Sequence, residues 1–243
     1  MIIMAEIRLQ KYFTDCGIMS RRAAEAEIAS GKVFVNDSVA TVGMKIDPER
    51  DVVKYKGKRV VASSSKGGGT YILVNKPIGY VTTSSDEKGR LTVLDLVKTL
   101  NKRVYPVGRL DMYSEGLLIM TDDGELTNRL THPSHGFTKT YVAEVVGELN
   151  DDDVYRISEP IEIDGYTVKR PKVQKLETKN GKTLVEIVLT EGRNRQIRRM
   201  CAEAGYKITA LKRVKIGEIE DITLSPGKWR YLTDDEIAYL KGL

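Results

Sequence analysis

Residues 108–120 of the chain read Gly108-Arg109-Leu110-Asp111-Met112-Tyr113-Ser114-Glu115-Gly116-Leu117-Leu118-Ile119-Met120. The last part of this stretch is an unbroken apolar run, which predicts a buried strand over residues 116–121. Asp111 stands just before that strand, two residues after Arg109. An aspartate in a loop is most often a turn or capping residue. A carboxylate that is held rigidly and kept ionised by a cation can also act as a nucleophile or a base, so Asp111 is a candidate catalytic group.

A basic segment lies far downstream of Asp111. Residues 191–199 read Glu191-Gly192-Arg193-Asn194-Arg195-Gln196-Ile197-Arg198-Arg199. We predict a helix over residues 194–204, on which Arg195 and Arg198 share a face because they are three residues apart. A basic helix face is often only solvated. This one could instead bind several phosphates. One of its arginines could turn inward and pair with Asp111; Arg198 is a candidate, and the spacing alone does not say which arginine it is.

A tyrosine lies in the middle of a third informative segment. Residues 139–145 alternate in the manner of a strand, with Lys139, Tyr141 and Ala143 on one face. A tyrosine at such a position usually belongs to the core. Next to a nucleophile, its ring could also stack on a base that has been extruded from RNA.

The composition suits a soluble protein with a polyanionic partner. The chain has 243 residues, enough for one large domain or two small ones, and a net charge of +5 with a pI of about 9.0. Its two cysteines, Cys16 and Cys201, form no metal-binding pattern, and neither do its two histidines. The N-terminus lacks the features of a signal peptide, and no apolar run reaches transmembrane length. We expect a cytoplasmic monomer without a metal or a membrane anchor.

The first 61 residues have the pattern of a small separate module. Two helices are predicted, one ended by Gly17 and one capped by Ser20, followed by a strand over residues 32–36 and a hairpin centred on residues 56–57. Three cations, Arg21, Arg22 and Lys32, flank the second helix, whose N-terminus is a natural phosphate site. Residues 62–69 are rich in serine and glycine and predict a flexible linker.

Residues 70–243 mix strands and helices in an order that is not βαβ. Strands are predicted over residues 71–75, 116–121, 139–146, 172–176 and 183–189, and an extended segment over residues 207–219. Helices are predicted over residues 92–100, 125–130, 151–157 and 194–204, and a last one is opened by a capping box at Thr233 and runs through Leu240. This order predicts an α+β domain with a mostly antiparallel mixed sheet flanked by helices.

Taken together, these motifs resemble those of the RsuA/RluB/RluE/RluF-type pseudouridine synthases of ribosomal RNA. The resemblance rests on residues 108–111, Ser114-x-Gly116-Leu117, residues 139–141, residues 191–200 and the closing segment at residues 227–233. It extends over nearly the whole chain, from about residue 6 to residue 240. The N-terminal module resembles an S4 RNA-binding domain, which members of this family commonly carry.

The resemblance implies a mechanism and assigns roles to residues. Asp111 matches the catalytic aspartate, Tyr141 the tyrosine that stacks on the base, and Arg198 the basic residue that pairs with the aspartate. Arg109 matches the motif arginine near the extruded nucleotide, and Leu189 an apolar residue of the base pocket. The chain would convert a specific uridine of ribosomal RNA to pseudouridine without a cofactor. The segment around Arg193 and Arg195 favours 23S over 16S RNA as the substrate.

Two other functions fit parts of the sequence. A non-catalytic RNA-binding or ribosome-assembly factor would use the S4-like module and the basic segment equally well. An RNA nuclease would need a metal-binding acidic cluster, for which Asp122-Asp123 is the nearest approach. Two aspartates and a glycine before a helix are more simply a turn and a cap.

Overall fold

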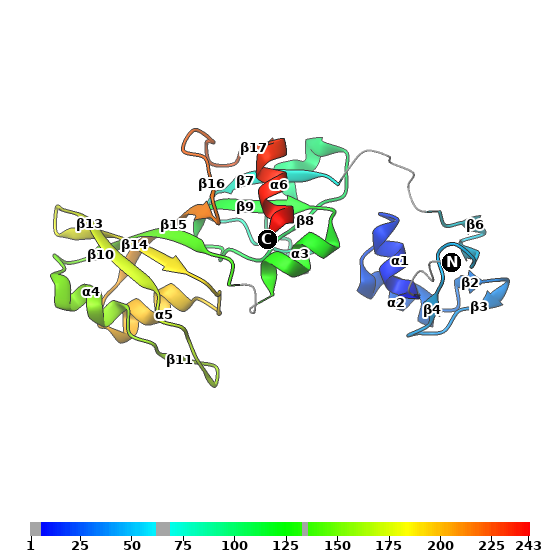
Figure 1. The fold of residues 1–243 in the computed structure, drawn as a ribbon, viewed down its shortest axis with the longest axis horizontal. Helices are drawn as coiled ribbons and strands as arrows, with labels where there is room; N and C mark the ends of the chain where they lie inside the picture. Colours follow the sequence, from blue (N-terminus) through cyan, green and yellow to red (C-terminus); the bar gives the residue numbers. More distant parts are fainter. Residues whose placement is uncertain (1–5, 62–68, 133–135) are drawn as a thin grey trace. The chain divides into compact units, whose positions relative to one another are not determined.

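The computed structural model describes residues 6–61, 69–132 and 136–243, which form two compact units, Met1–Gly68 and Gly69–Leu243 (Figure 1). The linker predicted over residues 62–69 lies outside the described residues except for Gly69. His135 also lies outside them. Each unit has its own hydrophobic core.

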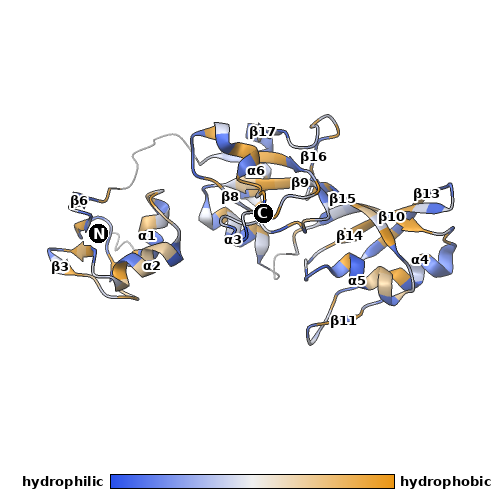
Figure 2. Cartoon of the chain, turned by 180° about the vertical axis from the view of Figure 1, so that it is seen from behind, coloured by the Kyte–Doolittle hydropathy of each residue, from blue (hydrophilic) through white to orange (hydrophobic). Residues whose placement is uncertain are grey.

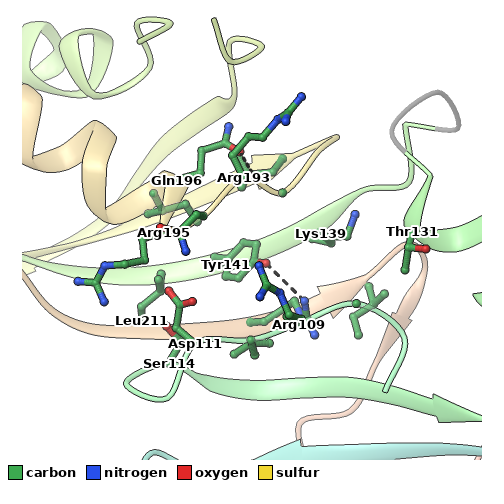
Figure 3. Close-up of a pocket in the computed structure, with 18 of the residues that line it drawn as sticks. Arg109, Asp111, Ser114, Thr131, Lys139, Tyr141, Arg193, Arg195, Gln196 and Leu211 are labelled. Atoms are coloured by element: carbon green, nitrogen blue, oxygen red, sulfur yellow. Dashed lines mark hydrogen bonds between the residues drawn. The ribbon is translucent and has the colours of Figure 1, made fainter. Parts of the chain in front are cut away.

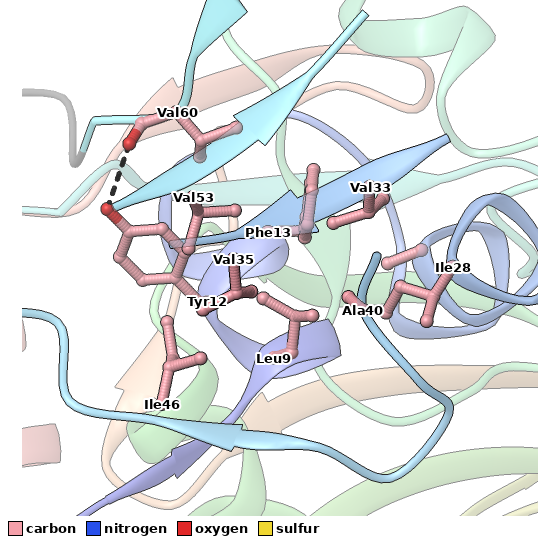
Figure 4. Close-up of a cluster of buried hydrophobic side chains, with 11 residues drawn as sticks. Leu9, Tyr12, Phe13, Ile28, Val33, Val35, Ala40, Ile46, Val53 and Val60 are labelled. Atoms are coloured by element: carbon pink, nitrogen blue, oxygen red, sulfur yellow. Dashed lines mark hydrogen bonds between the residues drawn. The ribbon is translucent and has the colours of Figure 1, made fainter. Parts of the chain in front are cut away.

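The N-terminal unit packs two helices, α1 (Leu9–Asp15) and α2 (Arg21–Ala29), against short strands. Its main sheet has the order β3-β2-β5-β6, and β1 pairs with β4. Helix α1 points Leu9 and Phe13 into the core, and the Tyr12 hydroxyl donates to the Val60 carbonyl at 3.1 Å (Figure 4). The strands are β1 (Ile7–Arg8), β2 (Val33–Val35), β3 (Ser38–Val39), β4 (Lys45–Ile46), β5 (Val53–Tyr55) and β6 (Lys58–Arg59).

The C-terminal unit is built on one large sheet with the order β13-β14-β10-β15-β9-β7-β17. Strand β8 pairs with β9, and β16 pairs with β15. All of these pairs are antiparallel except β9–β15, which is parallel, so the predicted α+β fold with a mostly antiparallel mixed sheet is confirmed. The strands are β7 (Tyr71–Lys76), β8 (Tyr105–Pro106), β9 (Glu115–Thr121), β10 (Lys139–Val146), β13 (Lys172–Lys179), β14 (Lys182–Leu189), β15 (Ile208–Ile216), β16 (Ile219–Glu220) and β17 (Trp229–Tyr231).

Helices cover the two halves of this sheet separately. On one half, α4 (Asp151–Ile157) and α5 (Gln196–Glu203) pack on β10 and β14. On the other half, α3 (Gly124–Thr131) and α6 (Asp234–Gly242) pack on β7 and β9. A small hairpin of β11 (Glu162–Ile163) and β12 (Tyr166–Thr167) stands apart from the sheet. No described helix has the length and apolar character needed to cross a membrane.

Residues 117–120 of strand β9 are all apolar, and both faces of this part of the strand are covered. Leu117 and Ile119 pack toward α3 and α6, whereas Leu118 and Met120 pack on the opposite side with residues around the 3-10 helix η1 (Asp95–Leu100). The strong apolar colour of β9 in Figure 2 reflects this double burial. The segment that follows Asp111 is therefore anchored in the centre of the unit.

The two halves of the sheet join at a short parallel contact between β9 and β15. Only Glu115–Lys212 and Gly116–Arg213 are in register there. Gly116 has a φ of +115°, and a Cβ atom at this position would lie 2.2 Å from the Arg213 carbonyl oxygen. Glycine is required because no side chain fits between the two strands.

Two of the predicted helices were wrong in detail. Over residues 92–100 the structure has only the 3-10 helix η1. The Asp95 carboxylate accepts from the amide and hydroxyl of Thr92 at its start, and the non-helical backbone of Val97 (φ −116°, ψ 19°) interrupts it. Over residues 194–204, α5 begins at Gln196. Arg195 is its N-cap residue in a left-handed conformation, so the argument that Arg195 and Arg198 share a helix face does not hold.

Candidate active site

A cavity of about 240 Å³ lies at the joint between the two halves of the sheet. Residues that are far apart in the sequence meet there (Figure 3). Among the residues that line it, Asp111 is the only carboxylate, whereas six side chains are cationic. The cations are Arg109, Lys139, Arg193, Arg195, Arg198 and Arg213.

Asp111 lies in a tight turn that leads into β9. The Ser114 amide donates to the Asp111 carbonyl oxygen at 3.0 Å, and the Met112 carbonyl accepts from the Gly79 amide at 2.8 Å. Thr82 fixes the preceding residue, since its hydroxyl exchanges hydrogen bonds with the main chain of Leu110. The Asp111 side chain itself is half-buried and has no hydrogen bond or ion pair with the described residues. The main chain of the turn is thus fixed, while the carboxylate oxygens of Asp111 stay available to a ligand.

Arg198 lies beside this turn but does not form the expected ion pair with Asp111. Its Nη2 donates to the Tyr113 carbonyl at 2.7 Å, and no ion pair within 4.0 Å joins it to Asp111 in the described structure. Burial and the nearby Arg195 lower the pKa of Arg198, and the charge of Asp111 opposes this shift. Arg198 therefore influences Asp111 through the electrostatic attraction between their charges and through its hydrogen bond to the main chain of the turn.

Lys76 is a buried cation below the turn that sequence reasoning missed. It is the last residue of β7, is fully buried, and donates from Nζ to the Ser114 carbonyl at 2.7 Å and to the Pro77 carbonyl at 3.0 Å. Burial lowers the pKa of Lys76 to about 8, with Asp111 acting in the opposite direction. Its one signal in the sequence is its place just after the apolar residues 71–74 and Asn75, which does not distinguish a buried lysine from an exposed one.

Tyr141 and Arg213 face the cavity from neighbouring strands, β10 and β15. Arg213 is 3% exposed, its Nε donates to the Leu117 carbonyl at 2.7 Å, and its Nη1 lies 3.5 Å from the Tyr141 hydroxyl oxygen. The dashed line from the Tyr141 hydroxyl in Figure 3 marks this last contact. Arg213 was not among the predicted residues, although it shares the inward face of its strand with the apolar Leu211.

Lys139 lines the cavity on the same face of β10 as Tyr141. Its Nζ donates to the Phe137 carbonyl at 2.8 Å. Burial, and secondarily the charge of Arg213, lower the pKa of Lys139 to about 8. Burial in the cavity wall, more than the neighbouring positive charge, therefore shifts Lys139 toward its neutral form.

The remaining predicted residues also line the cavity, in different ways. Leu189 is buried at the end of β14, and Arg109 and Arg195 are exposed at the rim. The guanidinium of Arg193 stacks on the Tyr166 ring, 3.8 Å from its centroid. Arg193 is thereby held against the β11–β12 hairpin.

The segment before α5 is held by a buried carboxylate. Glu191 is 6% exposed and accepts hydrogen bonds from the Lys169 amide, the Gln196 side chain and the Tyr166 hydroxyl. Gln196 in turn accepts from the Arg193 amide at 3.0 Å. These bonds fix the loop that carries Arg193 and Arg195 and explain why the helix begins only after it.

Three residues of the cavity carry buried polar atoms without a hydrogen-bond partner among the described residues. They are Ser114 Oγ, Arg198 Nε and Arg213 Nη2. Only two other such atoms, Gln10 Oε1 and Asn75 Oδ1, are found in the described parts of the chain. Buried hydrogen-bonding groups normally have partners, so three unpartnered atoms around one cavity indicate that a polar ligand binds there.

A second cavity, of about 410 Å³, adjoins the first at Asp111. It shares Arg109, Leu110, Asp111 and Asn194 with the first cavity, and its other wall is formed by residues between Val81 and Arg90. The Arg90–Asp86 ion pair, with N···O 2.6 Å, braces this wall and holds the pKa of Asp86 at about 2. A ligand larger than one nucleotide can thus extend past Asp111.

The predicted RNA-binding cations of the N-terminal unit lie at the two ends of α2. Arg21 and Arg22 are exposed in its first turn, which is capped by the Ser20 hydroxyl accepting from the Ala23 amide at 3.2 Å. Neither arginine has an ion pair within this described unit. Lys32 is exposed and pairs with Glu27 at 3.3 Å.

No group of three or more His, Cys, Asp or Glu side chains in the described ranges could hold a metal ion. The Asp122-Asp123 pair has structural partners instead. Asp122 accepts from the Thr70 amide at 2.7 Å, and Asp123 caps α3 by accepting from the amides of Glu125 and Leu126. The two aspartates act as a turn and a cap.

Comparisons with known proteins agree with the site. A family model described as RNA pseudouridylate synthase matches residues 70–203. An uncharacterized RNA pseudouridine synthase of Aquifex aeolicus (strain VF5) is 40% identical, with 98% of this chain and 94% of the relative covered. Ribosomal large subunit pseudouridine synthase B of Bacillus subtilis (strain 168) is 36% identical, with 97% of this chain and 96% of the relative covered.

A further relative and a solved structure extend the comparison. The dual-specificity RNA pseudouridine synthase RluF of Escherichia coli (strain K12) is 36% identical over 97% of this chain and 79% of its own length. A crystal structure of a pseudouridylate synthase matches with a TM-score of 0.66 and 28% identity, covering 96% of this chain and 99% of that chain. These matches confirm the resemblance drawn from the motifs. The chain therefore belongs to the RNA pseudouridylate synthase family.

Proposed function

We propose that this enzyme converts one specific uridine of ribosomal RNA to pseudouridine, with 23S RNA as the favoured substrate and 16S RNA as the alternative. The observation that carries the proposal is the cavity in which Asp111 is the single carboxylate among six cations. The names of the Bacillus subtilis and Escherichia coli relatives support an RNA substrate and, for the former, the large subunit. Such a substrate implies action in the cytoplasm. Because one chain supplies the whole cavity, a monomer suffices.

In the proposed reaction, Asp111 is the nucleophile. It attacks the extruded uridine at C1′ or at C6, and the bond between C1′ and N1 breaks. The base rotates, C5 bonds to C1′, and the bond between Asp111 and the substrate breaks, which restores the carboxylate. The C5 proton then leaves and N1 ends with a proton, so no atom is gained or lost overall. Tyr141 stacks on the base and assists proton removal, Arg198 maintains the charge of Asp111, and Arg109 and Leu189 bind the nucleotide.

The proposed substrate can be identified by mapping pseudouridines in ribosomal RNA from cells with and without this gene. We expect one or a few uridines to lose the modification when the gene is absent. A non-catalytic assembly factor would leave every pseudouridine in place, and that result would contradict the proposal. Membership of the synthase family favours the enzyme over the assembly factor.

Activity should be unaffected by removal of metal ions from the reaction. Asp111 needs no Lewis acid to attack an electron-poor carbon, and the arginines of the cavity supply the positive charge. We expect the same rate of pseudouridine formation with and without excess EDTA, provided that monovalent salt keeps the RNA folded. A nuclease or another metal-dependent hydrolase would lose its activity in EDTA.

We further propose that the N-terminal unit is an S4-like module that binds structured RNA. Replacing Arg21 or Arg22 with Ala should weaken RNA binding and lower the slope of log K against log salt by about one for each lost phosphate contact. Arg50→Ala serves as the matched control, because Arg50 is exposed in the same unit but pairs with Asp47 away from α2. An unchanged salt slope in both α2 variants would contradict the assignment.

A further inference from the structure

Arg213 is the most deeply buried of the six cations that line the cavity, and its guanidinium is only partly satisfied. Nε is bound to the Leu117 carbonyl and Nη1 contacts the Tyr141 hydroxyl. Nη2 has no acceptor among the described residues although the side chain is 97% buried, as its exposure of 3% shows. A guanidinium can only donate, so the group that completes Nη2 must bring an acceptor.

The surroundings restrict what that acceptor can be. Ser114 Oγ and Arg198 Nε, the two other unpartnered buried atoms of the cavity, are also able to donate. A ligand that satisfies these three donors needs several acceptor atoms and carries negative charge or develops it during the reaction. The apolar side chains of Leu189 and Leu211 and the Tyr141 ring suit a planar ring.

We propose that Arg213 is a further catalytic residue that donates from Nη2 to a carbonyl oxygen of the extruded uracil, and that a contact to O4 would also select uracil over cytosine. This inference rests on the function proposed above. Uracil presents two carbonyl oxygens, O2 and O4, whereas cytosine replaces O4 with an amino group that would oppose the guanidinium donor. When the bond between C1′ and N1 breaks, the electron pair stays on the base and its charge spreads to these oxygens. Arg213 then stabilises the detached base more than the bound nucleotide.

Replacement of single oxygen atoms by sulfur tests the contact, because sulfur accepts hydrogen bonds weakly. RNA fragments are made that contain the mapped uridine as uridine, 2-thiouridine or 4-thiouridine. Single-turnover rates are then compared within each enzyme, so that a general loss of activity cancels in the ratio. For the wild-type enzyme we expect about a tenfold slower reaction with sulfur at the contacted position and little change at the other.

Arg213→Gln is the informative variant. Glutamine places its amide nitrogen where Arg213 has Nε, so the bond to the Leu117 carbonyl can persist while both Nη atoms are removed. We expect this variant to be slower overall and to lose the sulfur effect. Tyr141→Phe is the matched control, because it removes the Nη1 contact but leaves Nη2, and it should be slower with the sulfur effect retained.

Different results would overturn the role of Arg213 and the proposed function of the enzyme. An undiminished sulfur effect in Arg213→Gln, or no sulfur effect at either position in the wild-type enzyme, overturns the role of Arg213. If Arg213→Gln does not fold, Arg213→Met takes its place, since it keeps a similar unbranched stem but has no donor, and a full sulfur effect there has the same meaning. Failure of the wild-type enzyme to form any pseudouridine from unmodified RNA refutes the proposed function instead.

Discussion

Replacing Asp111 with Asn is expected to abolish pseudouridine formation while leaving RNA affinity nearly unchanged. Asparagine keeps the size of the side chain and its main-chain surroundings but offers no nucleophilic carboxylate. Because the variant removes the group that forms the covalent bond, we expect a fall in the single-turnover rate on the order of 10⁴-fold or more. RNA affinity depends mainly on phosphate contacts of cations that the substitution does not touch.

The rate and the affinity should be measured on the same preparation of the Asp111 variant. Asp123→Asn is the matched control, because Asp123 caps α3 outside the cavity and asparagine caps helices equally well. The control should keep both activity and affinity. If Asp111→Asn kept a rate near that of the wild-type enzyme, Asp111 would not be the nucleophile.

The second large effect is structural and concerns Gly116. An alanine there would have to place its Cβ 2.2 Å from the Arg213 carbonyl oxygen and 2.6 Å from its amide nitrogen, in a backbone conformation with φ of +115°. Neither strand can yield without breaking the parallel contact that joins the sheet. We expect Gly116→Ala to lower the free energy of unfolding by more than about 3 kcal/mol, as measured by denaturant unfolding.

A substitution at Gly147 separates the two causes of this loss of stability, which are the close approach of Arg213 and the strain of a positive φ. It has a similar φ of +109°, but a Cβ atom would meet nothing within 4 Å. Gly147→Ala therefore reports the backbone strain alone, which should cost about 1 to 2 kcal/mol. Equal losses of stability in the two variants would show that the close approach of Arg213 is unimportant.

Features of the fold that depend on neighbouring residues could be predicted from the sequence. Ser20 and Thr233 cap their helices as expected, and the apolar run before Thr121 forms a buried strand. In these cases the signal and the structure lie within a few residues of each other. The family resemblance identified distant residues that do meet at one cavity, including Asp111 and Tyr141.

Features that depend on contacts across the sheet could not be predicted. Lys76 and Arg213 look like solvent-exposed cations of strands, and only the pairing of β7, β15 and β9 places them in the interior. Likewise, the sequence pattern predicted a helix that included Arg195. The hydrogen bonds of Glu191 and Gln196 instead hold the residues before Gln196 as a loop. Sequence spacing gives the order of such residues and not the direction in which they point.

The short contact between β9 and β15 links recognition to the mechanics of the molecule. Arg213 reaches across it by donating to Leu117, and Arg198 of α5 donates beside it to Tyr113 in the turn before β9. The same two side chains carry unpartnered donors of the cavity. A ligand that occupies those donors therefore contacts the residues that join the two halves of the sheet, next to Asp111 and Tyr141.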